Sequence, residues 1–141
     1  MNRVLRTCLV LGFALSVAGC SDSEGRVGGA DKTTVRGSGG ERLTLIKPVN
    51  ITLRRGGAEG VTIRLERNNF DDEVKVSISQ LPAGVEAVDS PRATRANEVE
   101  IVLRAGDNAD LVERHQALVT AEGPEGIRAT ETLELNVQPQ S

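Results

Sequence analysis

Aromatic side chains are almost absent from this sequence of 141 residues, which contains no tryptophan, no tyrosine and two phenylalanines. Phe13 lies in an apolar stretch near the N-terminus, which leaves Phe70 as the one aromatic residue of the remaining chain. Surfaces that bind sugars and platforms that bind single-stranded nucleic acids depend on aromatic faces for stacking. The composition therefore argues against both kinds of binding site.

Cysteine is also scarce, since the chain contains two copies, Cys8 and Cys20. Cys8 falls inside an N-terminal segment that we expect to be removed, so Cys20 has no partner for an internal disulfide. The folded part of the chain must then be stabilised by burial of apolar side chains alone.

Positive charge is not in excess, because 17 lysines and arginines stand against 20 aspartates and glutamates, a formal net charge of −3. Removing residues 1–19, which hold two basic residues and no acidic one, makes the net charge −5. A broad basic surface for nucleic acid is missing. We therefore expect no nucleic-acid partner.

Histidine occurs once, as His115. A zinc site usually needs several histidine or cysteine ligands. A serine–histidine triad would need His115 as its base, and the G-x-S-x-G motif that often presents the serine is missing. We predict that the chain is not an enzyme and interpret His115 as a surface residue.

The N-terminus begins with positive charge and continues with an apolar run that ends at a cysteine. Arg3 and Arg6 lie in the first seven residues, and residues 8–18 are largely apolar. This run is too short to span a bilayer as a helix and is typical of an export signal. With Val17-Ala18-Gly19-Cys20 at its end, the segment resembles the lipobox of bacterial lipoproteins.

The lipoprotein resemblance implies a signal peptide over residues 1–19 and a mature chain that begins at Cys20. In that family the cysteine thiol carries a diacylglycerol group, and the new N-terminus is often acylated, for example with palmitate. Two or more acyl chains hold a protein firmly on a membrane. Ser21, in place of aspartate, favours the outer membrane in the family's sorting pattern. We therefore expect a lipid-anchored protein of the cell envelope.

The acylated cysteine and the residues after it, 20–42, are predicted to form a flexible linker. The segment is rich in glycine and charge, and its only large apolar residues are Val27 and Val35. Such a segment buries too little surface to offset its ordering entropy. As a coil it would span roughly 25 Å.

From Leu43 onward apolar and polar residues alternate with a period of two, which is typical of strands with one buried face. Clusters of glycine, asparagine and aspartate separate the alternating segments. The segments whose apolar residues alternate are centred on Ile51–Leu53, Val61–Leu65, Val74–Ile78, Val99–Leu103, Ala117–Ala121 and Ile127–Val137.

The corner Leu81-Pro82-Ala83-Gly84-Val85, together with Leu53-Arg54-Arg55-Gly56-Gly57, resembles the immunoglobulin-like, fibronectin-III-like domains of bacterial envelope proteins. Proline fixes its own φ, and Gly84 is suited to a positive φ before the chain re-enters the sheet. The resemblance implies that the Leu81 side chain packs into the core between the two sheets. We predict an all-β, antiparallel immunoglobulin-like sandwich of six to eight strands over residues 43–139.

Two local features add detail to this prediction. Glu131 shares a face with apolar residues, which indicates a bulge or an exposed edge there. Residues Ala109–His115 have the composition of one short helical turn.

The densest group of oxygen ligands lies in the segment Asn68–Glu73, which contains Asp71, Asp72 and Glu73. Calcium accepts such ligands, and modules outside the cell bind it weakly. Adjacent acids at a turn are also commonly just solvated. Weak calcium binding, or binding of a small polar molecule, at this segment is the alternative function.

The preferred function is a non-enzymatic interaction or structural module whose partner is another envelope protein. Contact would run through a strand edge or an end loop. Charged residues of both signs alternate on the outward-facing positions of the strands, where they either provide solubility or form a polar partner surface. These residues are Arg54, Arg64, Glu66, Lys75, Glu100, Arg104 and Glu134.

Overall fold

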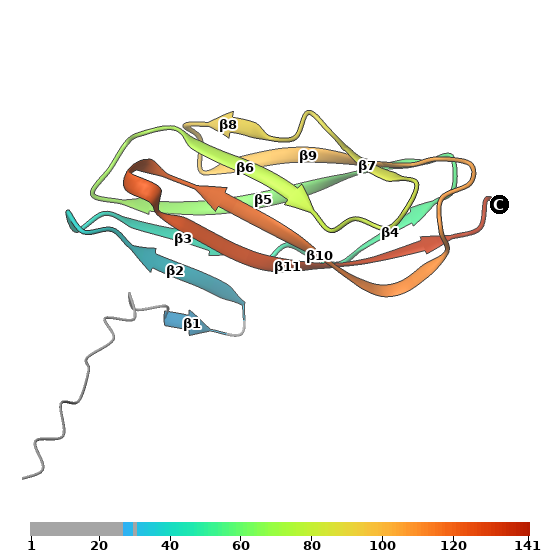
Figure 1. Ribbon diagram of the computed structural model, residues 1–141, viewed down its shortest axis with the longest axis horizontal. Coiled ribbons are helices and arrows are strands. Elements are labelled where there is room, and N and C mark those ends of the chain that lie inside the picture. The colour runs from blue at the N-terminus through green and yellow to red at the C-terminus, as the bar shows by residue number, and fades with distance from the viewer. Residues whose placement is uncertain (1–26, 30) are drawn as a thin grey trace, which may run out of the picture.

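The alternating segments form strands in the computed structural model, which describes residues 27–29 and 31–141, with side chains from Asp31 onward. The described residues form eleven strands and one turn of 3-10 helix, Pro124–Gly126 (Figure 1). The strands are β1 (Val27–Gly29), β2 (Lys32–Arg36), β3 (Arg42–Ile46), β4 (Ile51–Arg54), β5 (Ala58–Asn68), β6 (Val74–Ser79), β7 (Val85–Val88), β8 (Arg92–Thr94), β9 (Glu98–Ala105), β10 (Val112–Glu122) and β11 (Arg128–Gln138).

Two sheets contain these strands, in the orders β1-β2-β3-β5-β9-β7 and β4-β11-β10-β6-β8. We call them the first and the second sheet. Pairing is antiparallel except between β4 and β11, which run parallel. The sets β3-β5-β9-β7 and β11-β10-β6 have the A-B-E-D and G-F-C order of an immunoglobulin sandwich. The predicted all-β, immunoglobulin-like fold is therefore confirmed, with eleven strands in the described residues where six to eight were expected.

The chain changes sheet between β3 and β4. Pro48 lies in this connection and is buried. Proline has no N–H for a strand ladder, so it ends β3 and lets the chain turn toward β11. Ile51 then pairs with Leu135 in the second sheet.

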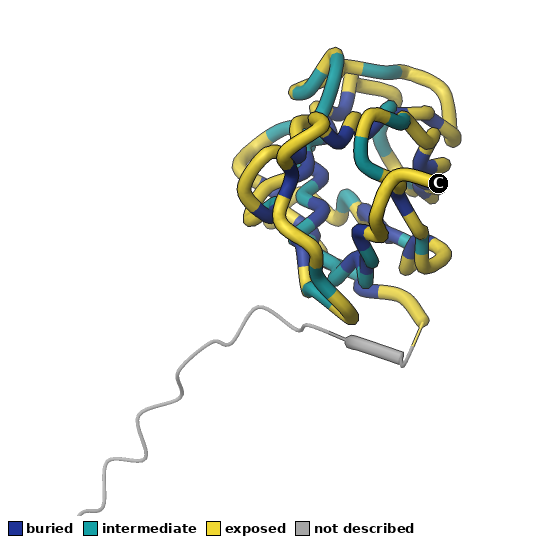
Figure 2. Tube along the Cα trace, turned by 90° about the vertical axis from the view of Figure 1, so that its right-hand side faces the viewer, coloured by how far each residue is buried: buried dark blue, intermediate teal, exposed yellow. Residues whose placement is uncertain are grey.

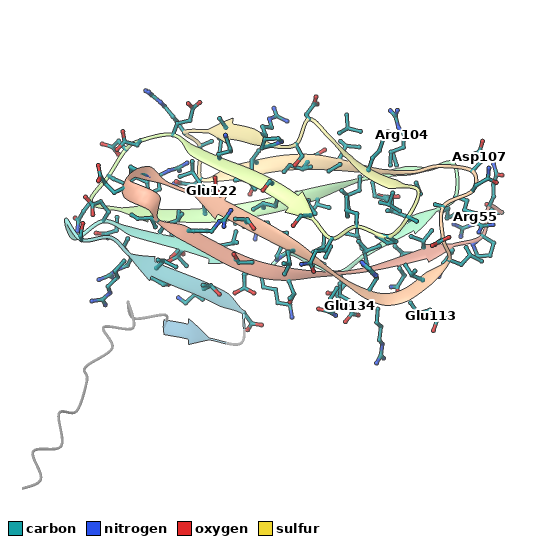
Figure 3. The ribbon with its side chains drawn as sticks, viewed as in Figure 1. Arg55, Arg104, Asp107, Glu113, Glu122 and Glu134 are labelled. Atoms are coloured by element: carbon teal, nitrogen blue, oxygen red, sulfur yellow. The ribbon has the colours of Figure 1, made fainter. Side chains whose placement is uncertain are left out.

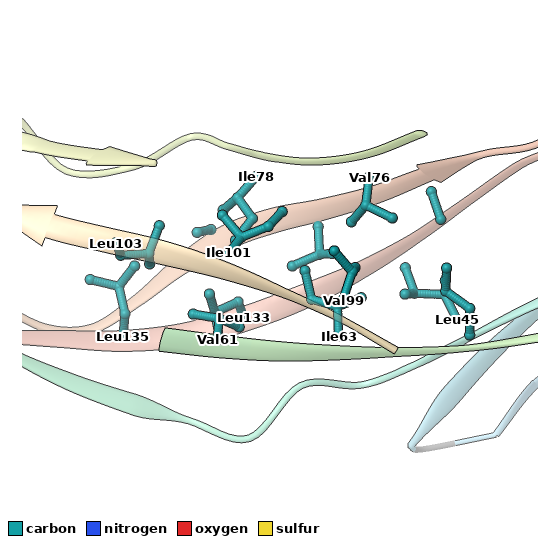
Figure 4. Packing of buried hydrophobic residues seen from close by; sticks show 14 of the residues in the cluster. Leu45, Val61, Ile63, Val76, Ile78, Val99, Ile101, Leu103, Leu133 and Leu135 are labelled. Atoms are coloured by element: carbon teal, nitrogen blue, oxygen red, sulfur yellow. The ribbon is translucent and has the colours of Figure 1, made fainter. Parts of the chain in front are cut away.

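The core fills the space between the two sheets, and buried residues line its inside while exposed residues cover the outside (Figure 2). Aliphatic side chains from both sheets interdigitate there (Figure 4). The largest fully buried side chains are Leu43, Leu45, Leu53, Val61, Ile63, Leu65, Val74, Val76, Ile101, Leu103, Leu133 and Leu135.

The first sheet begins earlier than the sequence predicts. Strand β2 lies inside the segment 20–42, and Lys32 pairs with Ile46 at one end while Arg36 pairs with Arg42 at the other. The linker prediction is therefore wrong for residues 32–42. Hydrogen bonds between the backbones of β2 and β3 order this polar segment. The linker prediction rested on the few apolar side chains of the segment, and that composition carries no information about backbone pairing.

Glu131 lies on the inner side of β11 because it has a partner there. The Thr33 hydroxyl donates a hydrogen bond of 2.6 Å to Glu131 Oε1, and Thr33 is only 4% exposed. The ladder between β10 and β11 is regular at Glu131, so the expected bulge is not at this residue. The register instead shifts between Val112 and His115.

The short helical turn expected over Ala109–His115 is also wrong. Ala109 is fully buried in the turn before β10, and β10 begins at Val112. Tertiary packing of Ala109 therefore overrides the local helical preference.

The corner between β6 and β7 follows the expected geometry. Leu81 is partly buried against the core, and Gly84 has a φ of 82°. A Cβ atom added at Gly84 would lie 2.6 Å from the Cα atom of Ala109. Glycine is therefore required both by the backbone conformation and by the close approach of the next loop.

Candidate binding surface at the arginine end

The sandwich has two ends, and hydrogen bonds between loops close the end that carries the C-terminus. Arg55 Nε donates to the carbonyl oxygen of Ala109 at 2.7 Å. The backbone N–H of Gly56 donates to Ala105, and that of Asp110 donates to Ala83, both at 2.9 Å. Figure 3 shows Arg55 at this end. These hydrogen bonds join the loops of this end to one another.

The opposite end is open, and we call it the arginine end. Its walls are the β5–β6 loop, Asn69–Glu73, and the β8–β9 loop, Arg95–Asn97. Between them lies an open depression of about 700 Å³. Its lining residues are Arg67, Asn69, Phe70, Asp71, Arg95 and Asn97.

Arg67 stands at the end of β5 and is fixed by three hydrogen bonds. One terminal nitrogen, Nη1, donates to Ala96 O at 2.8 Å and to Asn97 Oδ1 at 2.9 Å. The other, Nη2, donates to Thr94 O at 2.8 Å. Its Nε atom is buried and has no hydrogen-bond partner among the described residues. The β8–β9 loop thus holds this guanidinium in one orientation.

The charge of Arg67 is incompletely balanced. Burial lowers the pKa of the Arg67 guanidinium below its ordinary value, and the nearby charge of Asp71 acts in the opposite direction. An arginine nevertheless keeps its proton in a protein. Among the described residues, ion pairs within 4.0 Å join Arg64 to Glu98 and Arg128 to Glu122, and none includes Arg67.

Arg95 brings a second guanidinium to the same depression. Its side chain is exposed, and within the described part of the chain it makes no hydrogen bond or ion pair. Two positive charges, from Arg67 and Arg95, and one negative charge, from Asp71, therefore line the depression, and Asp72 and Glu73 follow in the same wall.

The sequence offers one signal that points to Arg67. Val61, Ile63 and Leu65 are the buried residues of β5, and Arg67 continues their period of two. A charged residue on the buried side of a strand needs a special environment. No signal links it to Arg95, because the fold alone brings the two loops together.

The predicted calcium ligands, Asp71, Asp72 and Glu73, lie in the β5–β6 loop and are all exposed. Asp71 lines the depression beside Arg67 and Arg95. In the part of the chain that the structure describes, no three His, Cys, Asp or Glu side chains gather as a metal site would require. Asp71 thus shares the depression with two arginines.

His115 lies in β10 and is half-buried. Its Nε2 atom is 2.6 Å from the carbonyl oxygen of Gln80. This contact ties β10 to the end of β6 and gives the imidazole a structural partner.

The outward-facing charged residues are distributed as the alternation predicts, and all except the half-buried Glu134 are exposed. Arg64 pairs with Glu98 at 3.2 Å across the outer face of the first sheet. The middle of the second sheet's outer face is uncharged by contrast. It carries Ser77, Ser79, Leu118, Thr120 and Thr132.

The predicted lipid-attachment residue, Cys20, and the signal segment 1–19 lie outside the described residues. Within the described residues, no helix has the length and apolar character needed to cross a membrane.

The fold defines the class of this protein as a small immunoglobulin-type sandwich. No family model matches the chain, and no curated protein matches it in sequence. One similar solved structure is a chimeric titin Z1Z2 functionalized with a KLER exogenous peptide from decorin. It is 16% identical over 70% of this chain and 95% of the titin chain, with a TM-score of 0.41.

A second similar structure is a twitchin kinase fragment from C. elegans, described as an autoregulated protein kinase and immunoglobulin domains. It is 17% identical over 67% of this chain, with a TM-score of 0.42, and the match covers 20% of the twitchin chain. The strand order, rather than these likenesses, defines the sandwich.

Proposed function

We propose that this protein is a membrane-anchored, non-enzymatic interaction module of a bacterial cell envelope. Acyl groups on Cys20 would hold it on the membrane, in the outer membrane by the lipoprotein sorting pattern. The sandwich would bind another envelope protein through its arginine end. The observation that carries the binding surface is the depression in which Arg67 and Arg95 lie together without an ion pair.

Other surfaces of the sandwich support binding less well. The strands at the edges of the two sheets, β1, β7, β4 and β8, have three or four residues each. Short edge strands offer few backbone groups to an added strand. The loops at the end near the C-terminus are joined by hydrogen bonds, and the depression of about 530 Å³ along β10 and β11 there contains one arginine, Arg114, beside Glu113. The arginine end instead brings two guanidinium groups to one depression.

The distance between anchor and domain also bears on this function. Strand β1 begins at Val27 and pairs with β2, so residues 21–26 separate Cys20 from the first strand. A fully extended segment of this length reaches at most about 22 Å. The sandwich would therefore stay close to the membrane surface, within reach of partners on the same membrane.

In-cell crosslinking followed by affinity capture of the full-length protein tests this function. The variants are Cys20→Ala, Arg95→Glu and a matched control, Arg104→Glu. Arg104 is likewise exposed, but it lies on the outer face of β9 away from the depression (Figure 3).

We expect one dominant partner with the wild-type protein and with Arg104→Glu. That partner should be lost with Cys20→Ala and strongly reduced with Arg95→Glu. Equal capture by Arg95→Glu and wild type would place the contact elsewhere on the sandwich. Full membrane retention of Cys20→Ala would refute the anchor.

A further inference from the structure

We propose that the depression at the arginine end is a carboxylate-binding site that takes an aspartate or glutamate side chain of the protein partner. This assignment rests on the proposed function, because it names the chemistry by which the partner is recognised. It replaces a cation as the ligand of the β5–β6 loop with an anion.

Arg67 and Arg95 line the depression with one carboxylate, that of Asp71, and Asp72 and Glu73 follow Asp71 in the same exposed loop. The two guanidinium groups favour an anion as the ligand, because a calcium ion would add two positive charges beside them. The acidic loop favours a carboxylate over a phosphate group, which carries nearly two negative charges at pH 7.

Arg67 is arranged in advance for this role. A guanidinium has five N–H donors, and Arg67 uses three of them on Thr94, Ala96 and Asn97. Of the two remaining hydrogens, the one on Nε is buried, and the one on Nη2 has no partner among the described residues, on a side chain whose position is already fixed. Binding then costs little side-chain entropy at Arg67.

Arg95 supplies the exposed half of the site. Its guanidinium is exposed and makes no hydrogen bond within the described residues, so all five of its donors are available. A planar guanidinium pairs with a carboxylate through two parallel N–H···O bonds. Arg95 can therefore close over a carboxylate whose position Arg67 has set.

The walls offer groups that suit the peptide around an acidic side chain. Asn97 Oδ1 is occupied by Arg67, which leaves the Asn97 amide hydrogens as donors. Asn69 donates to Gly40 O at 2.9 Å, which leaves its Oδ1 as an acceptor for a peptide N–H. The half-buried ring of Phe70 supplies an apolar wall for the aliphatic part of the ligand side chain.

The test is an NMR titration of the full-length, ¹⁵N-labelled lipidated protein in detergent. The probe is the blocked peptide acetyl-Gly-Gly-Glu-Gly-Gly-amide, compared with its glutamine counterpart and with inorganic phosphate. The protein variants are again Arg95→Glu and the control Arg104→Glu. The chemical-shift dispersion of each variant reports whether it is folded.

We expect the glutamate peptide to shift the backbone amides of Asn69 and Asn97 in a saturable way, while the glutamine peptide leaves them unchanged. Arg95→Glu should weaken binding at least tenfold, and Arg104→Glu should bind as the wild type does. Equal binding of both peptides, or an unchanged affinity of Arg95→Glu, would overturn the proposal. Tighter binding of phosphate than of the glutamate peptide would overturn it in favour of a dianion site.

The titration and the capture experiment fail in different ways. If partner capture depends on Arg95 but the glutamate peptide does not bind, the interaction function stands and the carboxylate assignment is wrong. If neither depends on Arg95, the arginine end is not the binding surface.

Discussion

Replacing Thr33 with valine should weaken the attachment of β2 to β11. Valine has nearly the shape of threonine, so the change removes the hydroxyl and little else. The lost hydrogen bond is 2.6 Å long and ends on the Glu131 carboxylate. Thr33 is 4% exposed, and Glu131 is half-buried.

Hydrogen bonds to charged groups contribute about 1.5–3 kcal/mol, and the half-buried position of Glu131 places this one near the lower value. We expect Thr33→Val to lower the free energy of unfolding by about 1.5 kcal/mol. For a domain of this size, that corresponds to a fall in Tm of about 6 °C. Thr62→Val, on the exposed face of β5, is the matched control and should change stability by less than about 0.5 kcal/mol.

Urea unfolding followed by far-UV circular dichroism measures both values, because the chain has no tryptophan or tyrosine for fluorescence. Together with the single variant Glu131→Leu, the double variant Thr33→Val/Glu131→Leu completes a mutant cycle. It should recover much of the lost stability, since replacing both partners with apolar groups leaves no polar group unpaired. Hydrogen exchange should also be faster at the β2 amides of Thr33→Val.

Equal stability of Thr33→Val and Thr62→Val, with no coupling between Thr33 and Glu131, would refute this reasoning. In that case the hydrogen bond would contribute nothing to the attachment of β2. Backbone pairing with β3 would then hold the strand by itself.

Three further outcomes are expected. Gly84→Ala should lower the free energy of unfolding by about 3 kcal/mol, because the added Cβ atom would lie 2.6 Å from the Cα atom of Ala109. Gly126 has a φ of 75° but no atom within 4 Å of the added Cβ, so Gly126→Ala should lower it by only about 1 kcal/mol. Equal losses in urea unfolding would show that the contact with Ala109 is unimportant. Leu133 is fully buried in the core, so Leu133→Ala should lower the free energy of unfolding by about 3 kcal/mol. Leu111 is half-exposed, so Leu111→Ala should lower it by about 0.5 kcal/mol or less. Similar Tm values for the two variants would contradict the packing described. Adding 5 mM calcium should leave Tm unchanged. A calcium site with a Kd of about 1 mM would raise the free energy of unfolding by about 1 kcal/mol and Tm by about 4 °C. A rise of that size would favour calcium as the ligand of the β5–β6 loop.

Most of the sandwich follows from local patterns in the sequence. Side chains of a strand point alternately to its two faces, so residues such as Val61, Ile63 and Leu65 identify a strand and its buried side without any knowledge of its neighbours. The corner at Gly84 is also readable, because proline and glycine restrict or extend the backbone at their own positions. The alternation and the corner can both be read from the sequence because each depends only on residues that are close together in the chain.

Only the tertiary structure decided the placement of β2, the partner of Glu131 and the surroundings of Asp71. Strand β2 is held by backbone hydrogen bonds to β3, and its polar side chains carry no sign of them. Asp71 is an acidic loop residue in the sequence, and the fold places it in one depression with Arg67 and Arg95. The physical reason is the same in each case: hydrogen bonds and Coulomb forces act between groups that are close in space, and the periodic pattern of a strand does not specify which distant segment will supply the partner.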